Sequence, residues 1–103
     1  MNQRTFSIAM SVAASFVLGT AAAHAYRGQE LASRAKIGNT EARAIALKAH
    51  PGKITDEELE RESGGSGLRY SFDIKRGAIT QEVGVDAQTG RVLENKKEGP
   101  HPD

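Results

Sequence analysis

The sequence predicts an α+β fold, with one helix packed on a small antiparallel sheet of about three to four strands, after a cleaved signal peptide. Two periodicities lead to this prediction. Apolar residues recur at helical spacing within residues 39–50, and they alternate with polar residues along 68–75 and 79–85. A helix with one apolar stripe and a sheet with one apolar face each need one cover, so we expect them to cover each other.

The chain begins with the pattern of a secretory signal peptide, over residues 1–25. Arg4 gives a charged start, residues 6–18 are apolar apart from interspersed serines, and Ala23-His24-Ala25 has the form of a cleavage site. The apolar stretch is shorter than the about 20 residues that a transmembrane helix needs, although an uncleaved amino-terminal anchor is the alternative. We expect cleavage after Ala25, which leaves Tyr26 as the first residue of a periplasmic or secreted protein with no stable membrane span.

Composition limits what the mature protein can be. The chain has no cysteine, which excludes disulfides, a thiol nucleophile and a cysteine-based metal site. Its formal net charge is +1 at pH 7, and loss of Arg4 with the signal peptide brings this charge to about zero. A near-neutral protein lacks the basic surface that binds nucleic acid or anionic membranes. The remaining residues suffice for one small domain with a marginal core.

The helix is predicted over residues 39–50, after a polar lead-in over 26–36 that is either a frayed helix or a linker. Its apolar face consists of residues at helical spacing, namely Ala42, Ile45, Ala46 and Ala49. One of residues 38–40 is expected to cap its start. The sequence His50-Pro51-Gly52 ends it, because the residue before a proline avoids helical geometry and glycine permits the turn that follows.

Three strands are predicted after the helix. Residues 54–61 are the weakest candidate, because acidic residues crowd them and a short helix is the alternative. The second and third strands, 68–75 and 79–85, have alternating faces, and Arg76-Gly77 is the predicted two-residue turn between them. The positions expected to face the helix are Leu68, Tyr70, Phe72, Ile74, Ile79, Gln81, Val83 and Val85.

A turn and a further apolar run follow the third strand. Asp86 is placed to accept hydrogen bonds from nearby backbone amides, and Gly90 can adopt the positive φ that a tight reversal needs. Residues 91–93 resume an apolar run, so we interpret residues 83–93 as strand, turn and strand. Residues 95–103 are polar and contain two prolines, which predicts a disordered tail.

Three segments of the chain share a pattern with a known family. They are Ala-Arg-Ala-Ile-Ala-Leu-Lys-Ala-His-Pro-Gly-Lys-Ile at 42–54, Tyr-Ser-Phe-Asp-Ile at 70–74 and Val-Gly-Val-Asp-Ala-Gln-Thr-Gly-Arg-Val-Leu at 83–93. In this order they resemble the PepSY domain, and the PepSY-like domain covers residues 37–94. The chain departs from the family pattern at Glu57, where an apolar residue is common, and at Gly38, where a polar cap is common.

The resemblance implies a function that the residues alone do not. PepSY domains are secreted or envelope-facing modules, also found in propeptides of thermolysin-like metallopeptidases, and are proposed to restrain peptidases or to bind other envelope components. By this resemblance, the expected partner is another envelope or secreted protein, such as a peptidase. The positions expected to maintain the motif structurally are His50, Pro51, Gly52, Tyr70, Asp86 and Gly90.

No catalytic residue, cofactor-binding residue or metal ligand is predicted. The serines lack a nucleophile-elbow context, and the acidic run over 56–62 lacks the spacing of a known calcium site and fits a solvated edge strand. His50 has no partnering ligand nearby in sequence, and His101 with Asp103 would bind metal only weakly. The candidate binding surface is the polar face of the second and third strands, formed by Arg69, Ser71, Asp73 and Glu82.

The sequence therefore predicts a non-catalytic extracytoplasmic binding module, with peptidase inhibition or modulation as the activity that the resemblance implies. We expect partner contacts on that polar face, or by strand addition at the edge of residues 54–61. The alternative is a small ligand- or metal-responsive envelope sensor, which the carboxylates and His50 suggest.

Overall fold

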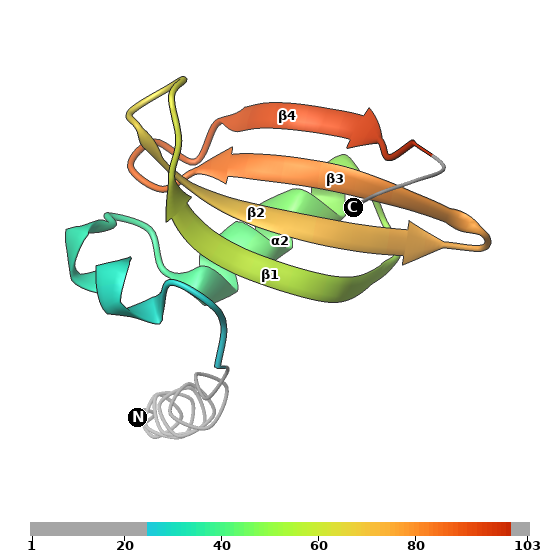
Figure 1. Ribbon diagram of the computed structural model, residues 1–103, viewed down its shortest axis with the longest axis horizontal. Helices are drawn as coiled ribbons and strands as arrows, with labels where there is room; N and C mark the ends of the chain where they lie inside the picture. The colour runs from blue at the N-terminus through green and yellow to red at the C-terminus, as the bar shows by residue number, and fades with distance from the viewer. Residues whose placement is uncertain (1–24, 100–103) are drawn as a thin grey trace, which may run out of the picture.

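A computed structural model describes residues 25–99 of the chain, so the predicted signal peptide, apart from Ala25, and residues 100–103 lie outside the described part. The elements in chain order are the 3-10 helix η1 (Gln29–Arg34), the α-helix α2 (Asn39–Ala49) and the strands β1 (Lys53–Arg61), β2 (Leu68–Arg76), β3 (Ile79–Asp86) and β4 (Val92–Lys97). The predicted α+β fold with one main helix is confirmed (Figure 1).

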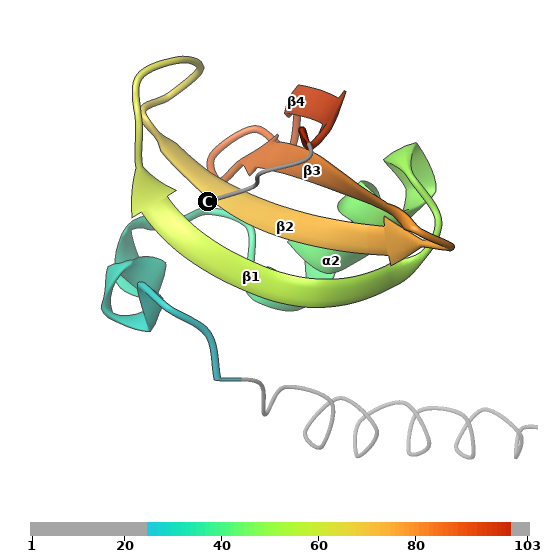
Figure 2. The same ribbon diagram turned by 45° about the vertical axis from the view of Figure 1, so that its right-hand side comes forward.

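The four strands form one antiparallel sheet in the order β1-β2-β3-β4, so each strand pairs with its neighbours in sequence. Helix α2 lies across one face of this sheet, and the two views show that no other described element covers the opposite face (Figures 1 and 2). Strands β1 and β4 are therefore the edges of the sheet. The uncovered face and the two edges are therefore the parts of the sheet that a partner could reach.

The hydrophobic core lies between α2 and the covered face. Its buried members are Ala42, Ala46, Leu59, Leu68, Tyr70, Phe72, Ile74, Val83, Val85 and Ala87. The Tyr70 hydroxyl donates a buried hydrogen bond of 2.8 Å to the carbonyl of Ile37, which ties the segment before α2 to the sheet. Burial and the neighbouring Tyr26 raise the pKa of Tyr70 to about 12, so the phenol keeps the proton that this bond requires.

Helix α2 begins and ends close to the predicted positions. Gly38 is its N-cap, with φ −83° and ψ 170°, and no side chain caps the helix there. At the other end the N–H of His50 donates to the carbonyl of Ala46 at 2.9 Å, and Pro51 prevents a further turn. Ala42 and Ala46 are both buried, and their small side chains let the helix axis come close to the sheet.

Strand β1 settles the ambiguity of the acidic segment in favour of a strand, because residues 53–61 pair with β2 along their length. A bulge between Ile54 and Asp56 interrupts the register. Glu57, on the covered face, accepts hydrogen bonds from Arg43 at 2.6 Å and from Asn39 at 3.1 Å, both from α2. An acidic residue thus replaces an apolar contact here because the helix supplies two donors for it.

The hairpin between β2 and β3 corrects the predicted turn by one residue. Arg76 still pairs with Ile79, so the turn residues are Gly77 and Ala78 rather than Arg76-Gly77. Gly77 has a φ of 65°, the left-handed conformation that such a two-residue turn requires. Ile79, predicted to face the helix, is 41% exposed because it lies beyond the end of the helical cover.

The turn after β3 is built around Asp86, as predicted. Asp86 is only 1% exposed, and its carboxylate accepts hydrogen bonds from the Ser66 N–H at 2.7 Å, the Ser66 hydroxyl at 2.8 Å, the Gln88 N–H at 2.8 Å and the Thr89 N–H at 3.1 Å. Burial alone would raise the pKa of Asp86, but these hydrogen bonds outweigh it and lower the pKa to about 2. Gly90 has the expected positive φ, 82°.

The two ends of the described chain are more ordered than the sequence suggested. The lead-in contains η1, and after it the amides of Lys36 and Ile37 both donate to the carbonyl of Ala87 at 3.0 Å. At the other end β4 runs to Lys97. Residues 95–97, predicted to belong to a disordered tail, therefore extend the sheet, because β3 offers them a pairing edge that sequence polarity does not reveal.

Candidate functional site

The uncovered face of the sheet, here called the open face, gathers polar side chains from all four strands. Register places alternate residues of each strand on it, because paired residues of antiparallel strands project to the same side. Its polar members include Lys53, Asp56, Glu58 and Glu60 of β1, Arg69, Ser71, Asp73 and Lys75 of β2, Thr80 and Glu82 of β3, and Glu94 and Lys96 of β4. The residues of the predicted binding surface, Arg69, Ser71, Asp73 and Glu82, all lie within this set.

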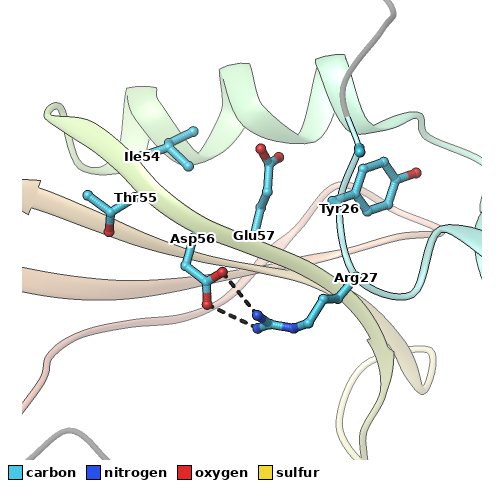
Figure 3. Close-up of a pocket in the computed structure, with 7 residues that line it drawn as sticks. Tyr26, Arg27, Ile54, Thr55, Asp56 and Glu57 are labelled. Carbon is cyan, nitrogen blue, oxygen red and sulfur yellow. Dashed lines mark hydrogen bonds and ion pairs between the residues drawn. The ribbon is translucent and has the colours of Figure 1, made fainter.

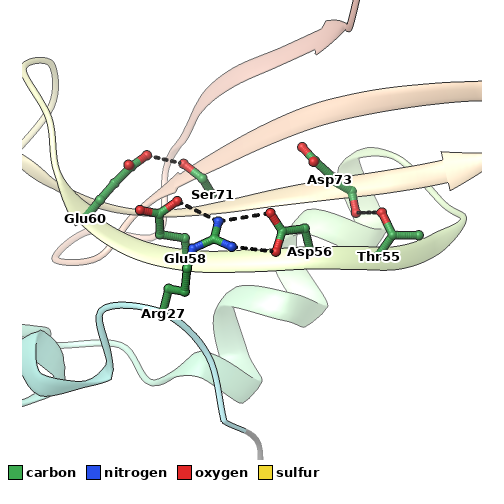
Figure 4. A network of polar contacts seen from close by, with 7 residues as sticks. All are labelled: Arg27, Thr55, Asp56, Glu58, Glu60, Ser71 and Asp73. Atoms are coloured by element: carbon green, nitrogen blue, oxygen red, sulfur yellow. Dashed lines mark hydrogen bonds and ion pairs between the residues drawn. The ribbon is translucent and has the colours of Figure 1, made fainter. Parts of the chain in front are cut away.

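Short polar contacts link β1 to β2 across this face. The Ser71 hydroxyl donates to a carboxylate oxygen of Glu60 at 2.8 Å. The Thr55 hydroxyl donates to the main-chain carbonyl of Asp73 at 3.3 Å (Figure 4). These contacts use Ser71 as a donor to a carboxylate and leave the carboxylate of Asp73 free of them.

Arg69 differs from its predicted state, because a solvated face was expected and the residue is only 7% exposed. Its guanidinium donates to Glu94 of β4 at 3.3 Å and to the carbonyl of Ser63 at 3.1 Å. The side chain crosses β3 at Gly84, where a Cβ atom would lie 3.2–3.3 Å from Arg69. The missing side chain at Gly84 therefore lets Arg69 lie flat on the sheet and reach Glu94.

Replacing Arg69 with alanine should therefore lower the free energy of unfolding by about 1–2 kcal/mol, more than a typical surface substitution. The change removes the packing over Gly84 and the donor to the Ser63 carbonyl, and it leaves Glu94 with only the longer ion pair to Lys96 at 3.8 Å. Urea denaturation of the two proteins measures the difference. A loss below about 0.5 kcal/mol would mean that the buried guanidinium contributes no net stability.

Carboxylates on the open face lie close enough to repel one another. Burial, followed by the charges of Glu98 and Asp56, raises the pKa of Asp73. Burial, followed by the charges of Glu94 and Asp73, raises the pKa of Glu82, which pairs directly with Asp73 across β2 and β3. The face thus holds negative charge that the chain's own cations do not fully compensate, and it favours a cationic group brought from outside.

The raised pKa values predict that stability changes with pH in a defined direction. A carboxyl whose pKa is higher in the folded than in the unfolded state stabilises the fold when protonated, and this contribution is lost as pH rises through the folded value. We expect the protein to melt at a higher temperature near pH 5 than at pH 7, since the ordinary values are 3.8 for Asp73 and 4.5 for Glu82.

The double variant Asp73→Asn/Glu82→Gln serves as the control for this pH dependence. It removes both charges with little change in shape, so its melting temperature at pH 7 should rise and should differ less between the two pH values. An unchanged pH dependence in the variant would show that the repulsion between these carboxylates does not limit stability.

Arg27 also contributes a side chain to the open face, and the sequence did not predict it. Its guanidinium lies between Asp56 and Glu58 and donates to Asp56 at 3.2 and 3.0 Å and to Glu58 at 3.0 Å (Figure 4). The hydrogen bonds that Arg27 donates to Asp56 and Glu58 raise its pKa further above the ordinary value. No local sequence signal joins a residue of the lead-in to a strand some thirty positions away, so only the fold reveals this contact.

The chemistry of the open face suits binding. Carboxylates accept hydrogen bonds from guanidinium and ammonium groups, and Arg27 shows this on the face itself. Ser71 and His50, two residue types that serve in catalysis elsewhere, are not brought together. The Ser71 hydroxyl donates to Glu60 on the open face, whereas His50 lies at the end of α2 on the other side of the sheet. Within residues 25–99 no three His, Cys, Asp or Glu side chains form a group that could hold a metal ion.

Comparison with known proteins gives one match. The family model described as "Peptidase propeptide and YPEB domain", named PepSY, matches residues 36–96. Searches of curated proteins and of solved structures each found no match. Among the residues that the structure describes, no helix is long and apolar enough to cross a membrane. Because the family model covers more than half of the chain, from before α2 to the penultimate residue of β4, the chain belongs to the PepSY family.

Proposed function

We propose that this protein is a non-catalytic extracytoplasmic binding module that inhibits or modulates a peptidase, and that the open face is its contact surface. Domains of this family are peptidase propeptide-like or regulatory modules, generally non-catalytic and typically extracytoplasmic. The signal-peptide pattern of residues 1–25 supports export, with cleavage after Ala25. The proposal assigns the protein to the regulation of a secreted or envelope partner.

One observation carries the proposal, namely that the open face is four strands wide and is covered by no other described element. A sheet face left to solvent needs only isolated polar residues to stay soluble. Here Asp73 and Glu82 stand opposite each other and repel, an arrangement that lowers the stability of the free protein. A cationic partner surface would relieve this repulsion on binding, and the relief of repulsion would add to the affinity of the complex.

Affinity capture tests the proposed function. The immobilised secreted protein is exposed to an extracytoplasmic extract of the source organism, and retained proteins are identified by mass spectrometry. We expect a peptidase among them, retained by the wild type and at least tenfold less by Asp73→Asn/Glu82→Gln. The activity of the retained peptidase is then assayed with and without the protein.

Glu41→Gln is the matched control, because Glu41 is exposed on the first turn of α2, away from the open face. This variant should retain the partner as the wild type does. Equal retention by all three proteins would remove the open face from the proposal. Retention of no peptidase, or no change in its activity, would refute the proposed function itself.

A further inference from the structure

The outer edge of β1 carries a short segment of the chain's own lead-in, residues 26–28. Leu59 of β1 donates its N–H to the carbonyl of Arg27 at 2.8 Å, and Arg27 forms a parallel bridge with Glu58. The Tyr26 ring lies against Tyr70, with the ring centroids 6.2 Å apart. Residues 26–27 thus lie along the edge strand, with a turn at Gly28, and the side chains of Tyr26 and Arg27 fix the segment. Figure 3 shows Tyr26 and Arg27 beside β1.

Side chains and main chain of β1 together define what this edge accepts. Asp56 and Glu58 are two positions apart, so their side chains project to the same side from Cα atoms about 7 Å apart, and their carboxylates come close enough for one guanidinium nitrogen to donate to both. The guanidinium of Arg27 makes two hydrogen bonds to Asp56 and one to Glu58. The planar fork of arginine suits such a pair of carboxylates better than the point charge of lysine does.

The segment also requires a glycine directly after the arginine. Gly28 has a φ of 83°, and a Cβ atom there would lie 1.8 Å from the carbonyl oxygen of Leu59. The clash would be with main-chain atoms of β1, which cannot rotate away. A backbone that approaches this closely therefore needs glycine at that position.

The ion pairs that fix Arg27 are exposed, whereas the Tyr26 ring is partly buried against Tyr70 and the core. The side chain of Arg27 is 60% exposed and that of Asp56 is 46% exposed, so salt screens their attraction. A cavity of about 300 Å³ continues along the edge, lined by Tyr26, Arg27, Ile54, Thr55, Asp56 and Glu57 together with Ala25. With cleavage after Ala25, the segment is the free amino-terminal end, and it joins the rest of the chain only through η1, whose N-cap is Gly28.

We propose that the β1 edge, with Asp56 and Glu58, docks an extended arginine-bearing segment of a partner protein, and that residues 26–28 occupy this site as an internal ligand in the free protein. This inference rests on the proposed function, because it assigns to the same protein–protein interaction a strand-addition contact and the chemistry of the partner. An internal ligand lowers the apparent affinity for the partner, because only the fraction of molecules in which the edge is free can bind it.

Peptide binding to the full secreted protein tests this inference. The probe is an acetylated, fluorescently labelled peptide with the sequence of residues 25–29, and anisotropy measures its affinity at low and at physiological salt. Gly28→Ala expels the internal segment and should bind the peptide at least tenfold more tightly than the wild type. A peptide with glutamine in place of its arginine should not bind, and the affinity for the original peptide should fall as salt rises.

Gly67→Ala is the matched control, because Gly67 also has a positive φ, 92°, but has no atom within 4 Å of the added Cβ. It should bind the peptide as weakly as the wild type. If Gly28→Ala fails to fold, the peptide affinity of Arg27→Ala is compared with that of Arg34→Ala. Arg34 is an exposed arginine of η1 and serves as the control. Arg27→Ala should raise the affinity about threefold because it removes only exposed contacts.

Equal affinities in Gly28→Ala and Gly67→Ala, with both proteins folded, would overturn the inference. A doubled molecular mass of Gly28→Ala in solution would also overturn it, since the occupant would then be a second copy of the chain. Failure of the peptide to bind while a peptidase is still captured would refute only this site. Tight peptide binding with no captured partner would refute only the proposed function.

Discussion

Replacing Phe72 with alanine is expected to lower the free energy of unfolding by about 3–5 kcal/mol, enough to unfold most of a domain of this size. Phe72 is completely buried, lies in the centre of β2 and stacks on Tyr70 with ring centroids 6.3 Å apart and an interplanar angle of 13°. The removed ring leaves a cavity between the sheet and α2 that its rigid neighbours cannot fill.

Urea denaturation followed by circular dichroism measures this loss, with Arg76→Ala as the control. Arg76 is the last residue of β2 and is exposed, so its replacement should change the free energy of unfolding by less than about 0.5 kcal/mol. Arg69 is not a suitable control, although it lies on the opposite face, because it is buried. Similar losses in Phe72→Ala and Arg76→Ala would contradict the placement of the core.

Replacing Asp86 with alanine is expected to cost about 2–4 kcal/mol, the second largest effect. The carboxylate accepts all four hydrogen bonds that join Ser66, Gln88 and Thr89 to the turn. Its loss leaves these donors without a partner in a part-buried site, and hydrogen bonds to a charged acceptor are the stronger kind. The Ser66 loop and the β3–β4 turn should loosen together, which amide hydrogen exchange would detect.

The pKa of Asp86 adds a pH test with its own sign. The folded-state pKa of about 2 lies below the ordinary value of 3.8, so the unfolded state binds the proton first. Stability from Asp86 is therefore complete above about pH 4 and is lost as pH falls toward 2. Asp86→Asn, which keeps an acceptor but has no charge, should lack this acid-induced loss. An equal acid-induced loss in this variant would assign the effect to other groups.

The fold could be predicted largely because its periodicities are clear. Alternation from Leu68 to Ile74 and the helical stripe from Ala42 to Ala49 each depend on local spacing. The strand has the predicted faces, and the helix buries Ala42 and Ala46 as predicted, whereas Ala49 in its last turn is exposed. Strand β1 stayed ambiguous because its glutamates favour helix as well as a solvated edge. Pairing with β2 decided it, and pairing is a long-range interaction that no local window contains.

The candidate site was predictable only in part, for the same reason. Strand alternation placed Ser71, Asp73 and Glu82 on one face, and the register confirms that placement. Alternation could not show that Gly84 makes room for Arg69 to lie flat and become buried. Nor could it place Arg27 between two carboxylates of β1, because the lead-in has no pattern that marks a docking segment.

Carboxylate footprinting tests most directly the claim that partners bind the open face. The protein is treated with a carbodiimide and glycine ethyl ester, alone and in complex with the captured partner, and labelled sites are located by mass spectrometry. We predict that Asp73 and Glu82 lose reactivity in the complex, while Glu30 in η1 and Glu41 in α2 keep theirs. Protection of Glu41 with continued labelling of Asp73 and Glu82 would place the partner on the helix side and contradict the proposed surface.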